Sequence, residues 1–179
     1  MGKRLASLCF ACVLYTHAAL AEARDFEAGL SAYNRADYTG AHDQWDPLAQ
    51  LGNAKAQFGM GLLYNFGQGV GIDRVRAMDW FARAARSGHA GAQLFLANGL
   101  ENGRGVERDI EAAFDWYLKA AEQGLGRAQN NLGRLYEHGR GVAPDLDIAI
   151  YWYEEAARSG NRNARANLAR LLGSRPSAQ

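Results

Sequence analysis

The feature that most constrains this chain is an internal repeat. Shifting the sequence by 36 residues brings Trp80, Trp116 and Trp152 into register. The same shift aligns three further sets, namely Gly67, Gly103 and Gly139, then Asp73, Asp109 and Asp145, and finally Gly88, Gly124 and Gly160. The complete units are residues 53–88, 89–124 and 125–160, with no insertion between them. A period of this length predicts supersecondary units that bury their apolar faces only by stacking on one another.

Each unit carries the pattern of a helical hairpin, which the third unit illustrates. Leu132 and Leu135 recur at helical spacing and predict a first helix. Gly133 lies between them and would allow a second helix to come close. Gly139 is expected to end the first helix because glycine adopts a positive φ without strain, and Asp145 is expected to cap the second. The apolar face of that second helix consists of Ala149, Trp152, Tyr153, Ala156 and Ala157.

Degenerate units flank the three complete ones. Residues 22–52 predict an N-terminal capping hairpin, in which Trp45 stands one position away from the tryptophan register. Residues 161–179 predict a partial C-terminal repeat and a tail, since Pro176 blocks the continuation of a helix. The whole pattern predicts an all-α solenoid of about four to five helical hairpins stacked at the 36-residue period.

The repeated residues resemble a known family. The pattern A-x-x-x-L-G-x-x-Y-x-x-G-x-G-V, followed by D-x-x-x-A-x-x-W-[YF]-x-x-A-A-x-x-G, is similar to the Sel-one-like repeat, a relative of the tetratricopeptide repeat. The resemblance covers residues 53–172 strongly and 25–52 weakly. It implies a right-handed α/α superhelix whose concave face makes protein–protein contacts. Exported bacterial members are similar to proteins of envelope assembly, polysaccharide secretion, signalling or host contact. Disulfide-rich members have been linked to β-lactam binding or hydrolysis, but this chain lacks their cysteines at the helix ends.

The N-terminus has the pattern of a signal peptide. Lys3 and Arg4 precede a mostly apolar run, and residues 19–21 give the small-x-small pattern that signal peptidase recognises. We expect residues 1–21 to be removed, with Ala23 as the alternative cleavage position. The competing interpretation is a membrane anchor, but the apolar run is shorter than the roughly 20 residues that a span requires. The protein is therefore expected to be exported, as a periplasmic or secreted protein, without stable membrane insertion after cleavage.

Cysteine and charge counts bound the possible partners. Cys9 and Cys12 both precede the expected cleavage position, so the mature chain would hold neither a disulfide nor a reactive thiol. The formal net charge of the full chain is +1. Lys3 and Arg4 are two of the 20 basic residues, so cleavage leaves 18 basic beside 19 acidic residues. Neither balance predicts binding to nucleic acid or to an anionic membrane.

Structural roles account for the residues that might otherwise suggest catalysis. The repeated aspartates each stand at an expected helix start, which favours capping over acid–base chemistry. The glycine loops follow no strand and carry no Lys-Ser or Lys-Thr pair, which argues against phosphate binding. The histidines lack metal-ligand spacing, and the equivalent positions of the tryptophans favour core packing over stacking on sugars. The sequence therefore predicts no enzyme, and no catalytic, cofactor or metal site.

A variable stripe along the first helices is the candidate binding site. Residues three, four and seven apart share one face of a helix, and likeness to tetratricopeptide repeats implies that this face lines the concave groove. Its side chains change between units while their neighbours repeat. They grade from apolar to amide-rich and basic, which suggests a peptide with an apolar end and an acidic end; the alternative is plain solvated surface. The predicted partner-binding residues are Lys55, Phe58, Leu62, Asn65, Leu94, Asn98, Glu101, Arg127, Asn130, Arg134, Glu137 and Arg170.

The leading functional prediction is a scaffold or adaptor that binds a protein or peptide partner in the cell envelope or outside the cell. Three alternatives stay open at this point. One is a β-lactam-binding or hydrolysing enzyme, the second is a cell-wall polysaccharide binder, and the third is a module that docks end to end with another repeat protein. The sequence predicts no particular oligomeric state.

Overall fold

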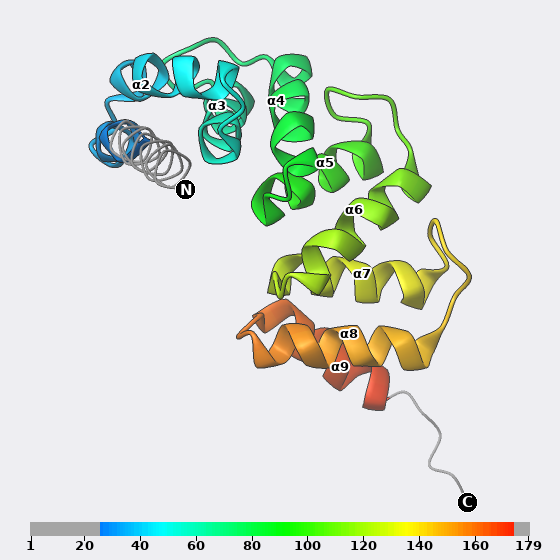
Figure 1. Ribbon diagram of the computed structural model, residues 1–179. Helices are drawn as coiled ribbons and strands as arrows, with labels where there is room; N and C mark the ends of the chain where they lie inside the picture. The colour runs from blue at the N-terminus through cyan, green and yellow to red at the C-terminus, as the bar shows by residue number, and fades with distance from the viewer. Residues whose placement is uncertain (1–25, 174–179) are drawn as a thin grey trace, which may run out of the picture.

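The computed structural model describes residues 26–173, and this part of the chain is helical throughout with no strand. The helices follow one another along a curved array, each packed against the next (Figure 1). The predicted all-α superhelical repeat fold is therefore confirmed, while the predicted signal peptide lies outside the described residues. Helical residues 26–34 come first, followed by α2 (Tyr38–Gln50), α3 (Ala54–Phe66), α4 (Arg74–Arg86), α5 (Ala90–Asn102), α6 (Ile110–Glu122), α7 (Gly126–His138), α8 (Leu146–Arg158) and α9 (Arg162–Gly173).

Aspartate caps set the start of each second helix. The second helices α2, α4, α6 and α8 begin at residues 38, 74, 110 and 146, one repeat apart. Asp73, Asp109 and Asp145 each accept a hydrogen bond from a backbone N–H in the first turn, as predicted. Asp37 caps α2 in the same way through the N–H of Gly40. The degenerate N-terminal unit therefore keeps the helix register of the complete units.

The two glycines of each turn have different structural roles. Gly103 ends α5 with φ +63°, the left-handed conformation predicted for it. The second glycine of the turn packs against the preceding unit. A Cβ added at Gly105 would lie 2.3 Å from the carbonyl oxygen of Arg74, and one at Gly141 would lie 2.7 Å from that of Ile110. No other residue fits there, because the atom that it would meet belongs to the backbone of the unit before.

The most deeply buried aromatic side chain of each hairpin is the one after the repeat tryptophan. Phe81, Tyr117 and Tyr153 have no exposed surface. Trp45 precedes Phe81 by one repeat and is 2% exposed, which explains why it stands one position from the tryptophan register. The tryptophans themselves pack at the edge of the core, with those of the second and third units only partly buried. Their predicted packing role is confirmed, but the centre of the core belongs to the next residue.

Small residues on the first helices make room for these aromatic rings. A Cβ at Gly133 would lie 2.8 Å from Cδ1 of Tyr153, which confirms the predicted close approach in the third unit. A Cβ at Gly61 would lie 2.4 Å from Cε1 of Phe81. The helices of a hairpin therefore pack ring against backbone.

Buried glutamines join each unit to the one before. The side-chain amide of Gln57 donates to the carbonyl oxygen of Ala49, at 3.0 Å. Gln93 and Gln129 make the equivalent bond to Ala85 and Ala121, each at 3.2 Å. Each bond adds a second hydrogen bond to a carbonyl in the last turn of a second helix, which also accepts the backbone N–H of the glycine that follows that helix. No helix in residues 26–173 combines the length and apolar character that crossing a membrane requires.

Candidate partner-binding groove

The predicted stripe runs along a layer formed by the first helices α3, α5, α7 and α9. Side-chain contacts join successive members of this layer. The amide of Asn167 in α9 donates to Oδ1 of Asn130 in α7, at 3.0 Å. Arg134 in α7 donates to Glu101 in α5, at 2.8 Å. The stripe is therefore partly an interface between neighbouring units.

Several stripe residues are buried inside this layer. Leu94 and Glu101 are each 3% exposed, and Asn130 is 9% exposed. Leu62 is partly buried and packs against the main core cluster. Their predicted role in binding a partner stays a prediction, and the structure leaves little of their surface for it.

The charged part of the stripe is arranged as buried carboxylates held by arginines. Glu101 accepts hydrogen bonds from Arg134 and from the hydroxyl of Tyr117, each at 2.8 Å, and its carboxylate lies 2.9 Å from the guanidinium of Arg140. One unit later, Glu137 accepts from Tyr153 at 2.7 Å and from Arg170 at 2.6 Å.

These contacts change the ionisation of the groups involved. Burial alone would raise the pKa of Glu137, but the hydrogen bonds from Tyr153 and Arg170 outweigh it and hold that pKa below its usual value. Burial first, and the adjacent carboxylate second, raise the pKa of the Tyr153 hydroxyl. The same causes raise the pKa of Tyr117 beside Glu101. Arg134 and Arg170 are therefore neutralised within the solenoid, and they are poor candidates for binding an acidic partner.

An open pocket lies between α3 and α5 at the less charged end of the layer. Phe66, which is 55% exposed, stands at its edge, and Phe66 and Phe95 meet edge to face with ring centroids 6.3 Å apart. The pocket has a volume of about 270 Å³, and we call it the aromatic pocket. Its lining residues are Asn65, Phe66, Met78, Leu94, Phe95, Asn98, Gly99, Asn102, Arg104 and Arg127.

A second pocket adjoins the aromatic pocket, since both are lined by Asn98 and Arg127. It has a volume of about 190 Å³ and is lined mainly by side-chain amides, so we call it the amide pocket. The two pockets together form what we call the first-helix groove. The residues that line the amide pocket are Asn98, Arg127, Asn130, Asn131, Asn161 and Asn163.

The first-helix groove is lined by five of the predicted stripe residues, of which Leu94 and Asn130 are buried: Asn65, Leu94, Asn98, Arg127 and Asn130. The sequence did not point to Phe66, Phe95, Arg104 and Asn131, which also line it. A signal for Arg104 was present, because it occupies the same turn position as Arg140 one repeat later. Lys55 and Phe58 lie outside it: Phe58 stacks on His89 with ring centroids 4.4 Å apart, and the Lys55 ammonium lies 5.7 Å from the centroid of the Phe26 ring.

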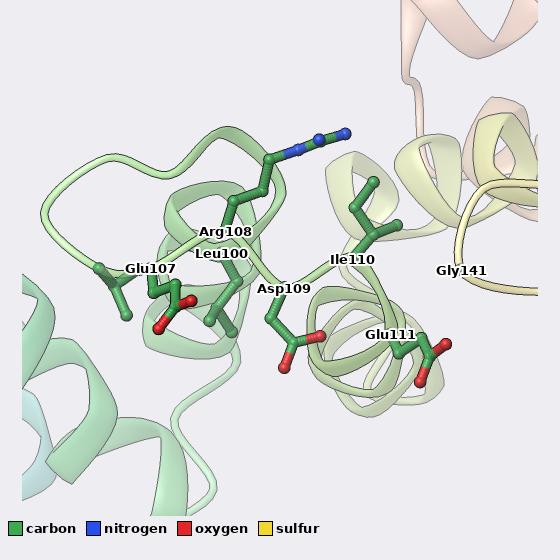
Figure 2. Close-up of a pocket in the computed structure, with 8 residues that line it drawn as sticks. Leu100, Glu107, Arg108, Asp109, Ile110, Glu111 and Gly141 are labelled. Atoms are coloured by element: carbon green, nitrogen blue, oxygen red, sulfur yellow. The ribbon is translucent and has the colours of Figure 1, made fainter.

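A wider pocket of about 640 Å³ lies at the turns between units, and Figure 2 shows its lining side chains. Glu107 and Asp109 point to one side and Arg108 points away from them, while Gly141 belongs to the turn of the next unit (Figure 2). The carboxylate of Asp109 accepts the N–H of Ala112, so its role here is that of a helix cap. Across residues 26–173, no three His, Cys, Asp or Glu side chains are grouped to hold a metal ion.

Comparison with known proteins agrees with this architecture. A family model described as the Sel1 repeat matches residues 54–89, 90–125 and 126–161. The structure is similar to that of a Sel1 repeat protein from Oxalobacter formigenes, with 32% identity, a TM-score of 0.74, and coverage of 84% of this chain and 62% of that one. A search of curated protein sequences found no match.

Two other solved structures extend the comparison. A protective antigen present in uropathogenic Escherichia coli strains, which displays an SLR fold, matches with 32% identity and a TM-score of 0.79, covering 84% of this chain and 33% of that one. The cysteine-rich protein B of Helicobacter pylori matches with 23% identity and a TM-score of 0.56, covering 70% of this chain and 90% of that one, a likeness of fold alone. The chain therefore spans less than two thirds of the length of the first two proteins.

Proposed function

Because the chain belongs to the Sel1 repeat family, whose repeats typically serve as scaffolds for protein–protein interaction, we propose that it is an exported scaffold that binds a peptide segment of a partner protein in the first-helix groove. The observation that carries this proposal is the polar lining of the groove. Side-chain amides both donate and accept hydrogen bonds, as the peptide backbone does. A row of asparagines beside an aromatic edge therefore suits an extended peptide with apolar side chains.

The charge of the groove supports the same proposal. Neither pocket is lined by Asp or Glu, although both are lined by Arg127. The guanidinium of Arg127 has no ion-pair or hydrogen-bond partner within residues 26–173. An unpaired guanidinium presents five donors in a fixed geometry and is well suited to binding an acceptor group of a partner.

Export is part of the proposal, and its support is the N-terminal sequence. The basic pair, the apolar run and the Ala-Leu-Ala pattern together match a cleavable signal peptide. N-terminal sequencing of the protein recovered after expression of the full chain in a Gram-negative host tests this part. A mature N-terminus at residue 22 or 24, in protein recovered from the periplasm or the medium, supports export. An intact N-terminus in cytoplasmic protein contradicts it.

Binding is tested by immobilising the protein and selecting from a display library of random peptides. We expect an enriched set of sequences whose affinity falls at least about tenfold in Arg127→Ala, since a hydrogen bond to a charged group contributes roughly 1.5–3 kcal/mol. Arg86→Ala is the matched control, because Arg86 is an exposed arginine at the end of α4 and does not line the groove. Equal affinity of both variants would show that peptides bind elsewhere, and no enrichment would contradict the proposal.

The two alternative functions have their own tests. Soluble cell-wall glycan fragments are added as competitors in the same assay, and displacement of the peptide by glycan would favour a polysaccharide binder. A chromogenic β-lactam tests the enzyme alternative, for which we expect no hydrolysis above the buffer rate. Hydrolysis that follows the protein through purification would overturn the assignment as a non-catalytic scaffold.

A further inference from the structure

Two successive interfaces between neighbouring first helices contain equivalent residues that differ in charge. We call the interface of α5 with α7 the charged step and the interface of α3 with α5 the uncharged step. The step from α5 to α7 contains Glu101, Arg134 and Arg140. One repeat earlier, the step from α3 to α5 contains Asn65, Asn98 and Arg104 at the equivalent positions. The first step therefore keeps the arginine of the turn but lacks the carboxylate that this arginine binds in the second.

In the charged step, the carboxylate fills the space between the helices. Glu101 is 3% exposed and lies 2.8 Å from Arg134 and 2.9 Å from Arg140. The hydroxyl of Tyr117 donates to the same carboxylate at 2.8 Å. At this position of the repeat, a glutamate side chain is therefore buried, and its carboxylate is paired with Arg134 of the next first helix and with Arg140 of the next turn.

In the uncharged step, the equivalent residues Asn65, Asn98 and Arg104 all line the aromatic pocket of about 270 Å³. Its lining includes Arg104 and Arg127, and neither guanidinium has an ion-pair partner among the described residues. Asn98 replaces Arg134, and one hydrogen of its amide is used by the carbonyl of Leu94 at 2.8 Å, which leaves the second available. The pocket is thus lined by two arginines and three asparagines, without an Asp or Glu.

The remaining walls of the aromatic pocket are apolar. Phe81, which does not itself line the pocket, replaces the tyrosine that donates to the carboxylate in the charged step, and it stacks on the lining residue Phe95 with ring centroids 4.8 Å apart. Phe66 forms the exposed edge, with Met78 and Leu94 completing the apolar wall. An apolar side chain on the ligand would bury its surface here.

We propose that the aromatic pocket binds an acidic side chain of a partner peptide, with an apolar side chain beside it, so that the ligand carboxylate takes the place that Glu101 occupies one unit later. This inference rests on the proposed peptide-binding function and names the class of peptide. It moves the acidic end of the ligand away from Arg134 and Arg170, which have internal partners, to Arg104 and Arg127.

The protein itself provides a test that needs no ligand. Asn65→Glu restores the missing carboxylate, so we expect it to pair with Arg104, fill the pocket and raise the Tm by about 2–4 °C. Asn65→Gln, which has the same shape without the charge, is expected to leave the Tm unchanged. The rise is expected to vanish when Arg104→Gln is added. A rise that survives Arg104→Gln, or no rise at all, would overturn the assignment of this space as a carboxylate site.

The second test uses peptides taken from the display selection, synthesised with an acetylated N-terminus and an amidated C-terminus so that only side chains carry a carboxylate. We expect Glu→Gln or Asp→Asn in the peptide to weaken binding at least about tenfold to the unmodified protein. Asn65→Glu is expected to abolish binding of the acidic peptide. A peptide that binds equally well as the Gln form, or only with a free C-terminal carboxylate, would overturn this inference and leave the proposed function standing. No enrichment of any peptide would overturn both.

Discussion

At the scale of the residue, the fold depends on places where a side chain meets glycine. Phe81 and Tyr153 have no exposed surface because the first helix of each hairpin presents a glycine to the ring. In the second unit Ala97 takes that place beside Tyr117, and it is also fully buried. The repeat therefore has room for at most a methyl group at this position. Whether the methyl group fits depends on the position of the aromatic ring in each unit.

Gly61→Ala tests this contact. The new Cβ would lie 2.4 Å from Cε1 of Phe81, so we expect a loss of about 1–3 kcal/mol in the free energy of unfolding. The loss should appear although alanine is intrinsically the better helix former by about 1 kcal/mol. Urea denaturation measures it, with Gly71→Ala as control, since nothing lies within 4 Å of a Cβ there. A variant as stable as the parent would show that Phe81 moves aside without cost.

The buried carboxylate of Glu101 is the second residue-scale device. Glu101→Gln removes a charge that faces two guanidiniums, and we expect the free energy of unfolding to fall by about 2–3 kcal/mol. The loss is smaller than for a fully enclosed pair because the side chains of Arg134 and Arg140 are 36% and 33% exposed and can be solvated. Glu107→Gln, an exposed glutamate in the adjacent turn, is the control and should change little. Equal stability of the two variants would contradict the role assigned to Glu101.

At the scale of the helix, the N-caps of the first helices differ in chemistry. Asn53 caps α3 by accepting the N–H of Ala56, at 3.0 Å. His89 holds the equivalent place in α5 and accepts the N–H of Ala92 through Nδ1, at 3.2 Å. An imidazole can accept this bond only while it is neutral. The start of α5 is therefore the one of these two caps that depends on pH.

Burial first, and the charge of Lys55 second, lower the pKa of His89. The unfolded chain then takes up a proton near pH 6.5 that the folded chain resists, so stability should fall as the pH drops below about 6.5. His89→Asn supplies an acceptor that does not titrate, as Asn53 does in α3, and should remove this part of the dependence. Thermal unfolding between pH 5 and 8 checks the prediction, which fails if the parent and His89→Asn show the same slope.

Much of the helical framework was predictable from the repeat, because caps and turn glycines act locally and recur with the period. The pairing of Glu101 with Arg134 was not, because the two residues are 33 apart. Arg134 lies nearly one helical turn before the residue equivalent to Glu101, so a comparison at 36 residues never places the two together. The aromatic pocket was missed for a related reason. It is present where Asn65 stands in place of the glutamate found one repeat later at Glu101. The importance of that difference is evident only from the contacts that Glu101 makes in the structure.

At the scale of the whole molecule, stability is expected to be distributed along the array. In the described part of the chain each helix packs chiefly on its sequence neighbours, so damage at one end should not spread to the other. Arg170→Ala removes the link from α9 to Glu137 in α7, where the closest atoms are 2.6 Å apart. We expect faster amide hydrogen exchange in α9 and the end of α8, with α2 to α4 unchanged.

Arg162→Ala is the control for that experiment, because it lies on the same helix, is exposed and does not contact Glu137. It should leave exchange in α9 as in the parent. Uniformly faster exchange from α2 to α9 in Arg170→Ala would show that the array unfolds as a single cooperative unit, and the nearest-neighbour description would then be wrong.

The contact of Gly105 with the backbone of Arg74, and of Gly141 with that of Ile110, has a consequence for how such a chain can change in length over generations. A turn that gains or loses a residue displaces the glycine from the neighbouring carbonyl and so spoils two hairpins at once. A genetic duplication or deletion of one whole unit re-creates the same junction at the new boundary and spoils none. The array can therefore gain or lose whole hairpins without disturbing its junctions, whereas a change of one residue in a turn disturbs two hairpins.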